Sequence, residues 1–579
     1  MLSLTSHEDE QFASPTFDFK LDNHNTATPT TAARTGTLTF ARRPTPPTAS
    51  STRDDDGLQG QTRELKTPNL ISYTRKGAVP HLTRDNVARL PNEMVHVSLE
   101  HMIMDQSINV AFTHAPFSLH RYLGFNASTS SPKSQLVCLS LRDETDEINL
   151  PPNSDHHAVA CTLRGAVRVS PQSFLNATLP RPPDLLFAFG EDATTETMTT
   201  KRADKCIRRS LNWVEQIAIG AKDRTNVFAP LVGGDSLQAR SEYSKALTGI
   251  ASSRASANIV RDPNEPTIDD HIKGYVVTCP THVNDRTTLC QLLNASFKPL
   301  SNLKPRVAQL VKGPHDILTL VRHVGIDLFV EEWSNTCATL GVALDFNFPV
   351  NKNHNRDTST SSSSRPDMVT TSNKFDIGHC LFDQRYQTSF IPLSQSNLLN
   401  NNSLNEQSDS KTLVPSTRAY LHHLFNAHEM TGSIILTLHN NLIMSNFIKM
   451  IQYLIQKNDG SFEFECDEFF KYYDQGLTTM KGGSRVYQCV ERAKKAWQLV
   501  EQERGKGSLK DKRGDNLEQS SSPTSSNSTT VNSLSNDIAA TGLDNLLPNK
   551  TGTSTPDLER EQMAVSENKL RNPLQNKSV

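Results

Sequence analysis

Cysteine and histidine are among the residues of this chain whose types could bind a metal or attack a substrate. The nine cysteines are scattered and form no Cys-x-x-Cys pair, so the sequence has no zinc or redox site of that spacing. Cys337 has no evident base beside it in sequence, and His422, His423 and His428 have the spacing of buried or surface side chains rather than of convergent ligands. An odd number of scattered cysteines favours reduced thiols and therefore a cytoplasmic or nuclear protein rather than a secreted one.

The composition of the 579-residue chain limits how much of it can fold. Only 36% of the residues are hydrophobic and the mean hydropathy is −0.50, because Ser, Thr, Asn and Pro concentrate at about 41–62, 351–374, 394–412 and 506–579. We expect residues 1–12 and 506–579 to be disordered and residues 13–505 to fold, with the other three stretches as disordered polar insertions. No segment approaches the ~18 apolar residues of a membrane span.

Charge gives little sign of a nucleic-acid partner. Lys and Arg number 60 against 62 Asp and Glu, so any contact with RNA must be local. The predicted helix over 201–214 carries Lys201, Arg202, Lys205, Arg208 and Arg209 on one arc. Such an arc could contact phosphates, although the solvated outer face of a helix explains it more often.

Short apolar runs alternate with longer amphipathic segments between about 63 and 350, which predicts an α/β fold. About eight such units favour a closed (β/α)8 TIM-type barrel over an open doubly wound sheet, and the sequence has no GxGxxG or GxxxxGK[ST] phosphate loop. Residues 166–170 predict a peripheral hairpin. The predicted strands are Val95–Leu99, Gln135–Leu141, Leu185–Phe189, Asn226–Val232, Tyr275–Thr278, Val307–Val311, Ile326–Val330 and Val342–Phe348.

A C-terminal helical region follows the predicted barrel. Residues 416–457 and 484–504 have helical patterns. Between them lie five aromatic residues whose surface must pack on another element: Phe462, Phe464, Phe469, Phe470 and Tyr472.

Four fragments, in this order and spacing, resemble the tRNA-guanine transglycosylase family over about residues 30–475. The fragments are Lys66–Thr83, Val232–Asp235, Gly325–Phe329, and Thr417–Leu424 with the later pair His439 and Asn440. The resemblance is closest to the accessory branch of the family. It implies a (β/α)8 barrel, a role in exchanging guanine for queuine at wobble position 34 of tRNAs with GUN anticodons, and a heterodimer with a catalytic queuine tRNA-ribosyltransferase subunit. The family also suggests a peripheral position at the mitochondrial outer surface as an alternative location.

The positions of the family's catalytic residues are altered in this chain. A base exchange needs a carboxylate nucleophile and groups that read and protonate the purine. The resemblance places Val330 at the nucleophile, Gly190 at the second carboxylate and Val232 at the purine-reading Gln. We therefore expect no catalytic residue and a non-catalytic subunit.

Two other functions remain as alternatives. An active enzyme rebuilt on Glu331, Glu332 or Asp235 is one, although a shift of one residue along a strand turns a side chain to the opposite face. An RNA-binding or scaffold barrel without a partner enzyme is the other. Activity of the purified chain and co-purification of a partner distinguish the three.

The resemblance also implies a structural zinc, held by three cysteines and a histidine. The histidine position is His439, but Ser408, Ser410 and Leu413 stand at the cysteine positions, so zinc binding by this chain is doubtful. Catalytic members of the family associate through the face around that site and the following helix, although packing of Tyr420 and Leu424 within the chain is a competing explanation for the retained helix. We therefore expect Arg418 and Tyr420 to contact the catalytic subunit.

Overall fold

The computed structural model of the chain describes residues 16–22, 32–41, 62–104, 110–125, 135–145, 151–192, 199–249, 266–350, 374–400, 416–427 and 429–474. They belong to the first of two compact units, Met1–Glu491 and Arg492–Val579. The predicted disordered ends and the predicted helix over 484–504 lie outside the described residues, as do nearly all of the predicted insertions at 41–62 and 351–374.

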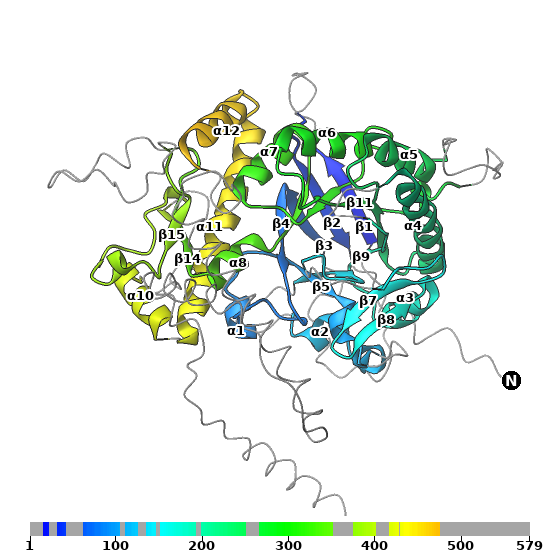
Figure 1. Cartoon of the computed structure of the whole chain (residues 1–579), viewed down its shortest axis with the longest axis horizontal. Helices are drawn as coiled ribbons and strands as arrows, with labels where there is room; N and C mark the ends of the chain where they lie inside the picture. Colours follow the sequence, from blue (N-terminus) through cyan, green and yellow to red (C-terminus); the bar gives the residue numbers. More distant parts are fainter. Residues whose placement is uncertain are drawn as a thin grey trace, which may run out of the picture. The chain divides into compact units, whose positions relative to one another are not determined.

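Eight parallel strands form a closed barrel, which confirms the (β/α)8 prediction (Figure 1). Around the barrel the strands follow their order in the chain, and β13 closes it by pairing with β4, where Val330 lies opposite Ile71. The barrel strands are β4 (Asn69–Tyr73), β5 (Met94–Ser98), β6 (Leu136–Ser140), β9 (Leu185–Phe187), β10 (Asn226–Leu231), β11 (Gly274–Thr278), β12 (Arg306–Gln309) and β13 (Leu328–Glu331).

One predicted barrel strand is wrong, and one barrel strand was not predicted. Within 342–348, only β14 (Val342–Leu344) is a strand, and it pairs antiparallel with β15 (Gly378–Cys380) outside the barrel. The barrel strand that was not predicted is β4, a short apolar run that follows Pro68. Apolar composition predicted that 342–348 is buried, but it could not predict which strand lies beside it.

Helices follow the barrel strands and cover the barrel from outside (Figure 1). The longest, α4 (Thr200–Ala221), begins where the Thr199 side chain accepts a hydrogen bond from the Arg202 amide, and it buries Ile207 and Trp213. The others are α1 (Arg84–Val87), α2 (Leu119–Leu123), α3 (Pro171–Thr178), α5 (Leu237–Leu247), α6 (Arg286–Phe297), α7 (Pro314–Val324) and α8 (Trp333–Thr339), with short 3-10 turns at Leu99–Met102, Ala111–His114, Asp269–His271 and Gln384–Tyr386.

Two small sheets accompany the barrel. The strands β1 (Thr16–Leu21), β2 (Gly36–Ala41) and β3 (Thr62–Thr67) form an antiparallel sheet, and Phe40 from β2 belongs to the same hydrophobic core cluster as Phe228 of the barrel. Since β3 runs directly into β4, this sheet closes the amino-terminal end of the barrel. The strands β7 (Ala158–Thr162) and β8 (Gly165–Val169) form the predicted peripheral hairpin.

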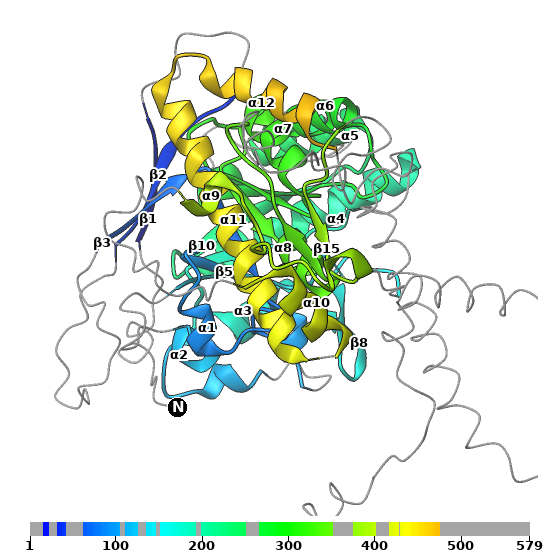
Figure 2. The same cartoon turned by 90° about the vertical axis from the view of Figure 1, so that its left-hand side faces the viewer.

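Beyond the barrel, a second layer is built on α11 (Met430–Lys457). Figure 2 shows α11 running from α10 (Arg418–Asn426) near one end to α12 (Ser461–Tyr472) near the other. The predicted helical segment 416–457 is thus two helices. A short α9 (Asn397–Asn400) precedes them, so the expected disorder at 394–412 is wrong for its first residues, where Leu398 is buried. Residues 401–412 lie outside the described residues. Phe469 of α12 lies within 6 Å of the rings of Phe346 and Phe348, so the aromatic cluster does pack on another element. No helix among the described residues is long and apolar enough to cross a membrane.

Candidate functional site

The carboxyl ends of the barrel strands are where (β/α)8 proteins build their sites, and here they surround a small cavity. Its volume is about 60 Å³. Small-molecule sites are typically larger than roughly 300 Å³, so a purine does not fit without rearrangement. The cavity is lined by Ser140, Leu141, Arg142, Glu144, Phe187, Ala188, Phe189, Gly190, Asp192, Pro230, Leu231, Val232, Val276, Thr278 and Gln309.

Val330, at the nucleophile position, belongs to the hydrophobic core of the barrel. Its side chain is buried in one cluster with Leu328, Ile71 and Val307. A valine has no atom that can attack a ribose carbon or transfer a proton.

Gly190 and Val232 lie against each other at the cavity. A Cβ atom built on Gly190 would lie 2.8 Å from Cγ1 of Val232 and 3.1 Å from Cγ of Pro230. Both distances are shorter than ordinary van der Waals contacts, so the Val232 side chain occupies the space in which a carboxylate at position 190 would begin.

The glycine loop after Val232 keeps a defined shape. One carboxylate oxygen of Asp192 accepts hydrogen bonds from the amides of Gly233 at 3.1 Å and Gly234 at 2.6 Å. From the other side, Nε of the fully buried Arg240 donates to the Gly234 carbonyl at 2.6 Å. The loop is therefore held by Asp192 and Arg240, which the sequence analysis did not identify. The sequence signals that could have identified them are that Asp192 follows a predicted strand and that Arg240 lies near the start of a helix.

The carboxylates of the rebuilt-enzyme alternative do not line this cavity. Glu331 is buried, and it accepts hydrogen bonds from the Ser334 amide at 2.7 Å and the Ser334 hydroxyl at 2.5 Å. Burial raises the pKa of Glu331 to about 7. Glu332 accepts from the Thr336 hydroxyl, and Asp235 lies 4.0 Å from His282. Each of the three serves a separate local contact.

Two other carboxylates line the cavity, and neither was predicted. Asp192 accepts the loop amides described above. Burial raises the pKa of Glu144, so this carboxyl is less readily ionised than an ordinary glutamate. Glu191, between Gly190 and Asp192, is tied to α4, where its carboxylate accepts from Arg209 at 2.9 Å. None of these carboxylates stands at a position where the family places a catalytic one.

A buried polar network fills the neighbouring strand ends. The hydroxyl of Tyr73 donates to Asp143 at 2.6 Å, and His96 lies 3.0 Å from the Ser140 hydroxyl. Burial and the Asp143 charge raise the pKa of Tyr73, while burial lowers the pKa of His96 to about 4. Both side chains are therefore neutral near pH 7, and their hydrogen bonds join β4, β5 and β6 into one rigid rim.

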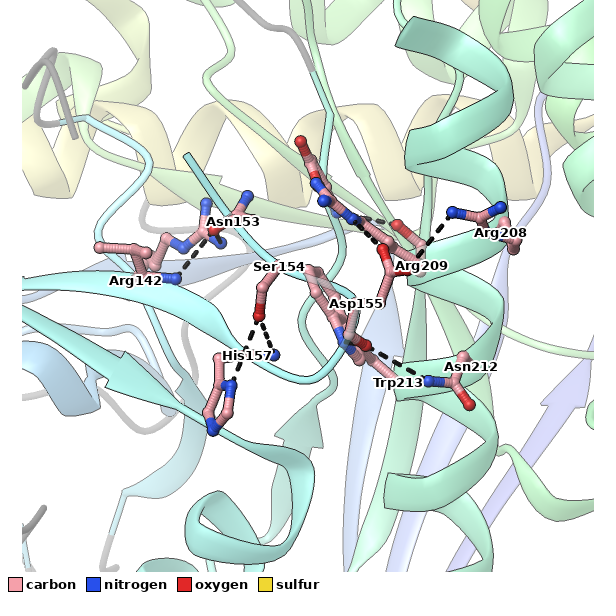
Figure 3. Close-up of polar contacts among 12 residues, drawn as sticks. Arg142, Asn153, Ser154, Asp155, His157, Arg208, Arg209, Asn212 and Trp213 are labelled. Carbon is pink, nitrogen blue, oxygen red and sulfur yellow. Dashed lines mark hydrogen bonds and ion pairs between the residues drawn. The ribbon is translucent and has the colours of Figure 1, made fainter. Parts of the chain in front are cut away.

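The basic arc of α4 divides into buried and exposed residues. Two of them, Arg208 and Arg209, both donate to the Asp155 carboxylate (Figure 3). Arg209 is buried, and its guanidinium donates to Asp155 at 2.7 Å. The backbone carbonyl of Asp155 accepts from Trp213 at 2.9 Å, so Arg209 and Trp213 anchor this loop to the helix. Arg209 is therefore not available to phosphates, whereas Lys201 and Lys205 are exposed.

His439, at the family's zinc-ligand position, is buried on α11. Its Nε2 donates to the carbonyl of Leu344 at 2.9 Å, and burial lowers the pKa of His439. The adjacent Asn440 accepts from the Leu344 amide at 3.0 Å, so both side chains dock α11 on β14. Ser408, Ser410 and Leu413 lie outside the described residues. Within those residues, no group of three or more His, Cys, Asp or Glu side chains could hold a metal ion.

The two residues expected at a subunit interface, Arg418 and Tyr420, differ in exposure. Arg418 is buried and its guanidinium donates to Asp345 at 3.2 Å, so the expectation that Arg418 contacts a partner is wrong. Its place at the first turn of α10 gave no sign of the carboxylate, which lies 73 residues earlier in the chain. The Tyr420 side chain is 46% exposed, and Leu424 of the same helix is buried.

Comparisons with known proteins agree with this geometry. The chain is similar to proteins named queuine tRNA-ribosyltransferase accessory subunit 2. The one from Schizosaccharomyces pombe is 25% identical, covering 71% of this chain and 80% of the relative. Those from Drosophila melanogaster and Ixodes scapularis are each 25% identical, covering 70% and 68% of this chain and 87% and 91% of the relative.

The family model that describes queuine tRNA-ribosyltransferase matches residues 30–475. That range contains the whole barrel, the altered cavity and the helices from α10 to α12. By this match and its closed barrel of eight parallel strands, the chain belongs to the queuine tRNA-ribosyltransferase family.

Proposed function

We propose that this protein is the non-catalytic subunit of a queuine tRNA-ribosyltransferase. It pairs with the catalytic subunit, which exchanges guanine for queuine at wobble position 34 of tRNAs with GUN anticodons. The similar proteins from three organisms carry the name accessory subunit 2, and their alignments span most of their lengths. Free cysteine thiols among the described residues fit a complex in the reducing cytoplasm.

The observation that carries the proposal is the occlusion of the cavity. Val232 fills the space beside Gly190, and Val330 is part of the barrel core. The resemblance assigns three chemical functions to positions 330, 190 and 232, and Val330, Gly190 and Val232 have no side-chain group that could supply them. A barrel that keeps this scaffold without its chemistry supports a partner that performs the exchange.

The surface proposed for association lies around the start of α10. Phe390 is 80% exposed, and Ile391 and Tyr420 are each 46% exposed. They lie together because the Ile391 carbonyl accepts from the Arg418 amide at 3.0 Å and the Ser389 carbonyl accepts from the Ala419 amide at 2.8 Å. Aromatic residues that a monomer leaves exposed are typical anchors of protein interfaces. We name Phe390, Ile391 and Tyr420 the apolar patch.

Co-expression with the catalytic subunit tests the proposal. We expect a one-to-one complex by size exclusion at micromolar concentration, and incorporation of labelled guanine or queuine into tRNA by the complex. We expect the isolated chain to incorporate no label above a heat-inactivated control.

The opposite results identify the alternatives. Turnover by the isolated chain would mean a rebuilt enzyme, and the carboxylates Glu144 and Asp192 at the cavity would then be the first to substitute. Separate elution of the two subunits would leave a barrel that acts without a partner enzyme.

A further inference from the structure

The segment between β14 and α10 converges on one buried carboxylate, that of Asp345. Asp345 follows β14 directly and is 5% exposed. One of its oxygens accepts hydrogen bonds from the Ser394 hydroxyl at 2.8 Å and the Gln395 amide at 2.9 Å. The other accepts from Nε2 of His379 at 2.7 Å and from the guanidinium of Arg418 at 3.2 Å. We name Asp345 and these four donors the Asp345 node.

The node joins segments that are distant in sequence. His379 belongs to β15, Ser394 and Gln395 lie before α9, and Arg418 begins α10. Its donors are themselves held in place. The other ring nitrogen of His379 lies 3.0 Å from the Tyr386 hydroxyl, and Nε of Arg418 donates to the Pro392 carbonyl at 3.2 Å. A buried carboxylate is stable only when such donors satisfy it, and here they come from β15, from the loop before α9 and from α10.

The side chains at this place do not suit a structural zinc. A zinc site of the family's kind needs thiolates, and Ser408, Ser410 and Leu413 supply none. His439 uses its Nε2 hydrogen for the Leu344 carbonyl, and both ring nitrogens of His379 already have partners. The donor set is that of an ionic hydrogen-bond network rather than of a metal.

We propose that the Asp345 node replaces the structural metal of the family and organises this region without zinc. The node's effect on association with a partner rests on the proposed function. The node holds Arg418, and the Arg418 amide donates to the Ile391 carbonyl in the segment that carries Phe390, so the node positions the apolar patch. Asp345 is thus a positioning residue for the association surface and does not itself contact the partner.

The first test is the metal content of the full-length chain, expressed in zinc-supplemented medium. We expect far less than one zinc per chain by elemental analysis, and no change in melting temperature on addition of EDTA. About one zinc per chain, released by EDTA and lost in His439→Ala, would overturn the proposal.

The second test measures whether the node holds this region. In Asp345→Asn, amide hydrogen exchange in 378–393 and 416–427 should rise roughly tenfold or more, while amides of β10–β12 keep their protection. Asp316→Asn is the matched control, because Asp316 is an equally buried carboxylate that accepts from Arg286 at 2.6 Å on the barrel helices. Unchanged exchange in Asp345→Asn, or the same pattern in both variants, contradicts the node. If Asp345→Asn does not fold, Ser394→Ala removes a single donor and is measured in the same way.

The third test separates the node from the proposed function. We expect Asp345→Asn to weaken association with the catalytic subunit and to raise local exchange, and Tyr420→Ala to weaken association with exchange unchanged. If Asp345→Asn raises exchange but neither variant affects association, the association surface is wrong and the node stands. If Tyr420→Ala weakens association while Asp345→Asn changes neither property, the node is wrong and the surface stands.

Discussion

Gly190 and Val232 compete for the same space, because a Cβ atom on Gly190 would come within 2.8 Å of Cγ1 of Val232. The family resemblance assigns the second carboxylate to position 190 and the purine-reading side chain to position 232. A carboxylate at position 190 would therefore have to displace the Val232 side chain.

The steric conflict between these residues can be measured as a coupling energy. Gly190→Ala should lower the free energy of unfolding by about 1–3 kcal/mol, because the new methyl group overlaps Val232. In a Val232→Ala background the same substitution should cost about 1 kcal/mol less, with the remainder due to Pro230. Urea unfolding of the four proteins gives the coupling. Additive costs would mean that the two side chains do not share space.

Restoring the nucleophile alone should fail. Val330→Asp places a carboxylate in the hydrophobic core cluster and should lower the free energy of unfolding by about 4 kcal/mol or more. Val330→Ala, which only removes methyl groups, should cost about 2 kcal/mol. Neither variant should incorporate labelled guanine into tRNA. Activity of Val330→Asp alone would contradict the argument that the purine-reading group is also required.

Glu331 should make stability depend on pH. Burial raises the pKa of this carboxyl from 4.5 to about 7, so the folded protein binds the proton more tightly than the unfolded chain does. This contribution to stability is present below pH 4.5 and is lost as the pH rises towards 7. Relative to wild type, Glu331→Gln should therefore gain up to about 3 kcal/mol between pH 4.5 and pH 8. Parallel stability profiles of the two proteins would rule out a raised pKa.

The association surface predicts different effects for two neighbouring residues. Tyr420→Ala should weaken the complex about tenfold or more without altering the melting temperature. Reversing the charge of Arg418 should instead destabilise the chain itself, because it leaves Asp345 buried opposite a second negative charge. The matched control is Tyr453→Ala, since the Tyr453 side chain is 42% exposed near the other end of α11.

Deletion of the tail provides a further check on the same surface. Residues 508–579 are rich in Ser, Asn and Thr, so their removal should leave the affinity unchanged by isothermal titration. A large loss on deletion would move the interface away from the apolar patch.

Local sequence patterns predicted most of the barrel. Seven of the eight predicted runs overlap barrel strands, because each is a short apolar segment bounded by residues that end strands. The eighth, 342–348, has the same composition, yet its strand pairs with Gly378–Cys380 across a polar insertion. Which strands become neighbours depends on contacts distant in sequence, and no periodicity records them.

The same limit explains what was missed at the site. Val330, Gly190 and Val232 were found because a family pattern assigns those positions. Asp345 and Arg240 were not found, because their roles depend on hydrogen-bond partners that only the fold brings close. The donors to Asp345 lie 34 to 73 residues further along the chain, so the sequence around Arg418 does not predict that its guanidinium is buried against a carboxylate.

Asp192 and Arg240 hold the conformation of the glycine loop independently of the residues that would carry out a reaction. The resemblance assigns neither residue to reading the purine or attacking the ribose, so a substitution at those functional positions does not remove the hydrogen bonds that hold the loop. A duplicated gene could therefore lose its reaction while still presenting a partner with the surface of an intact barrel. Selection on such a protein acts on its fold and its binding surface. Arg240 should then tolerate substitution less well than positions 190, 232 and 330 do.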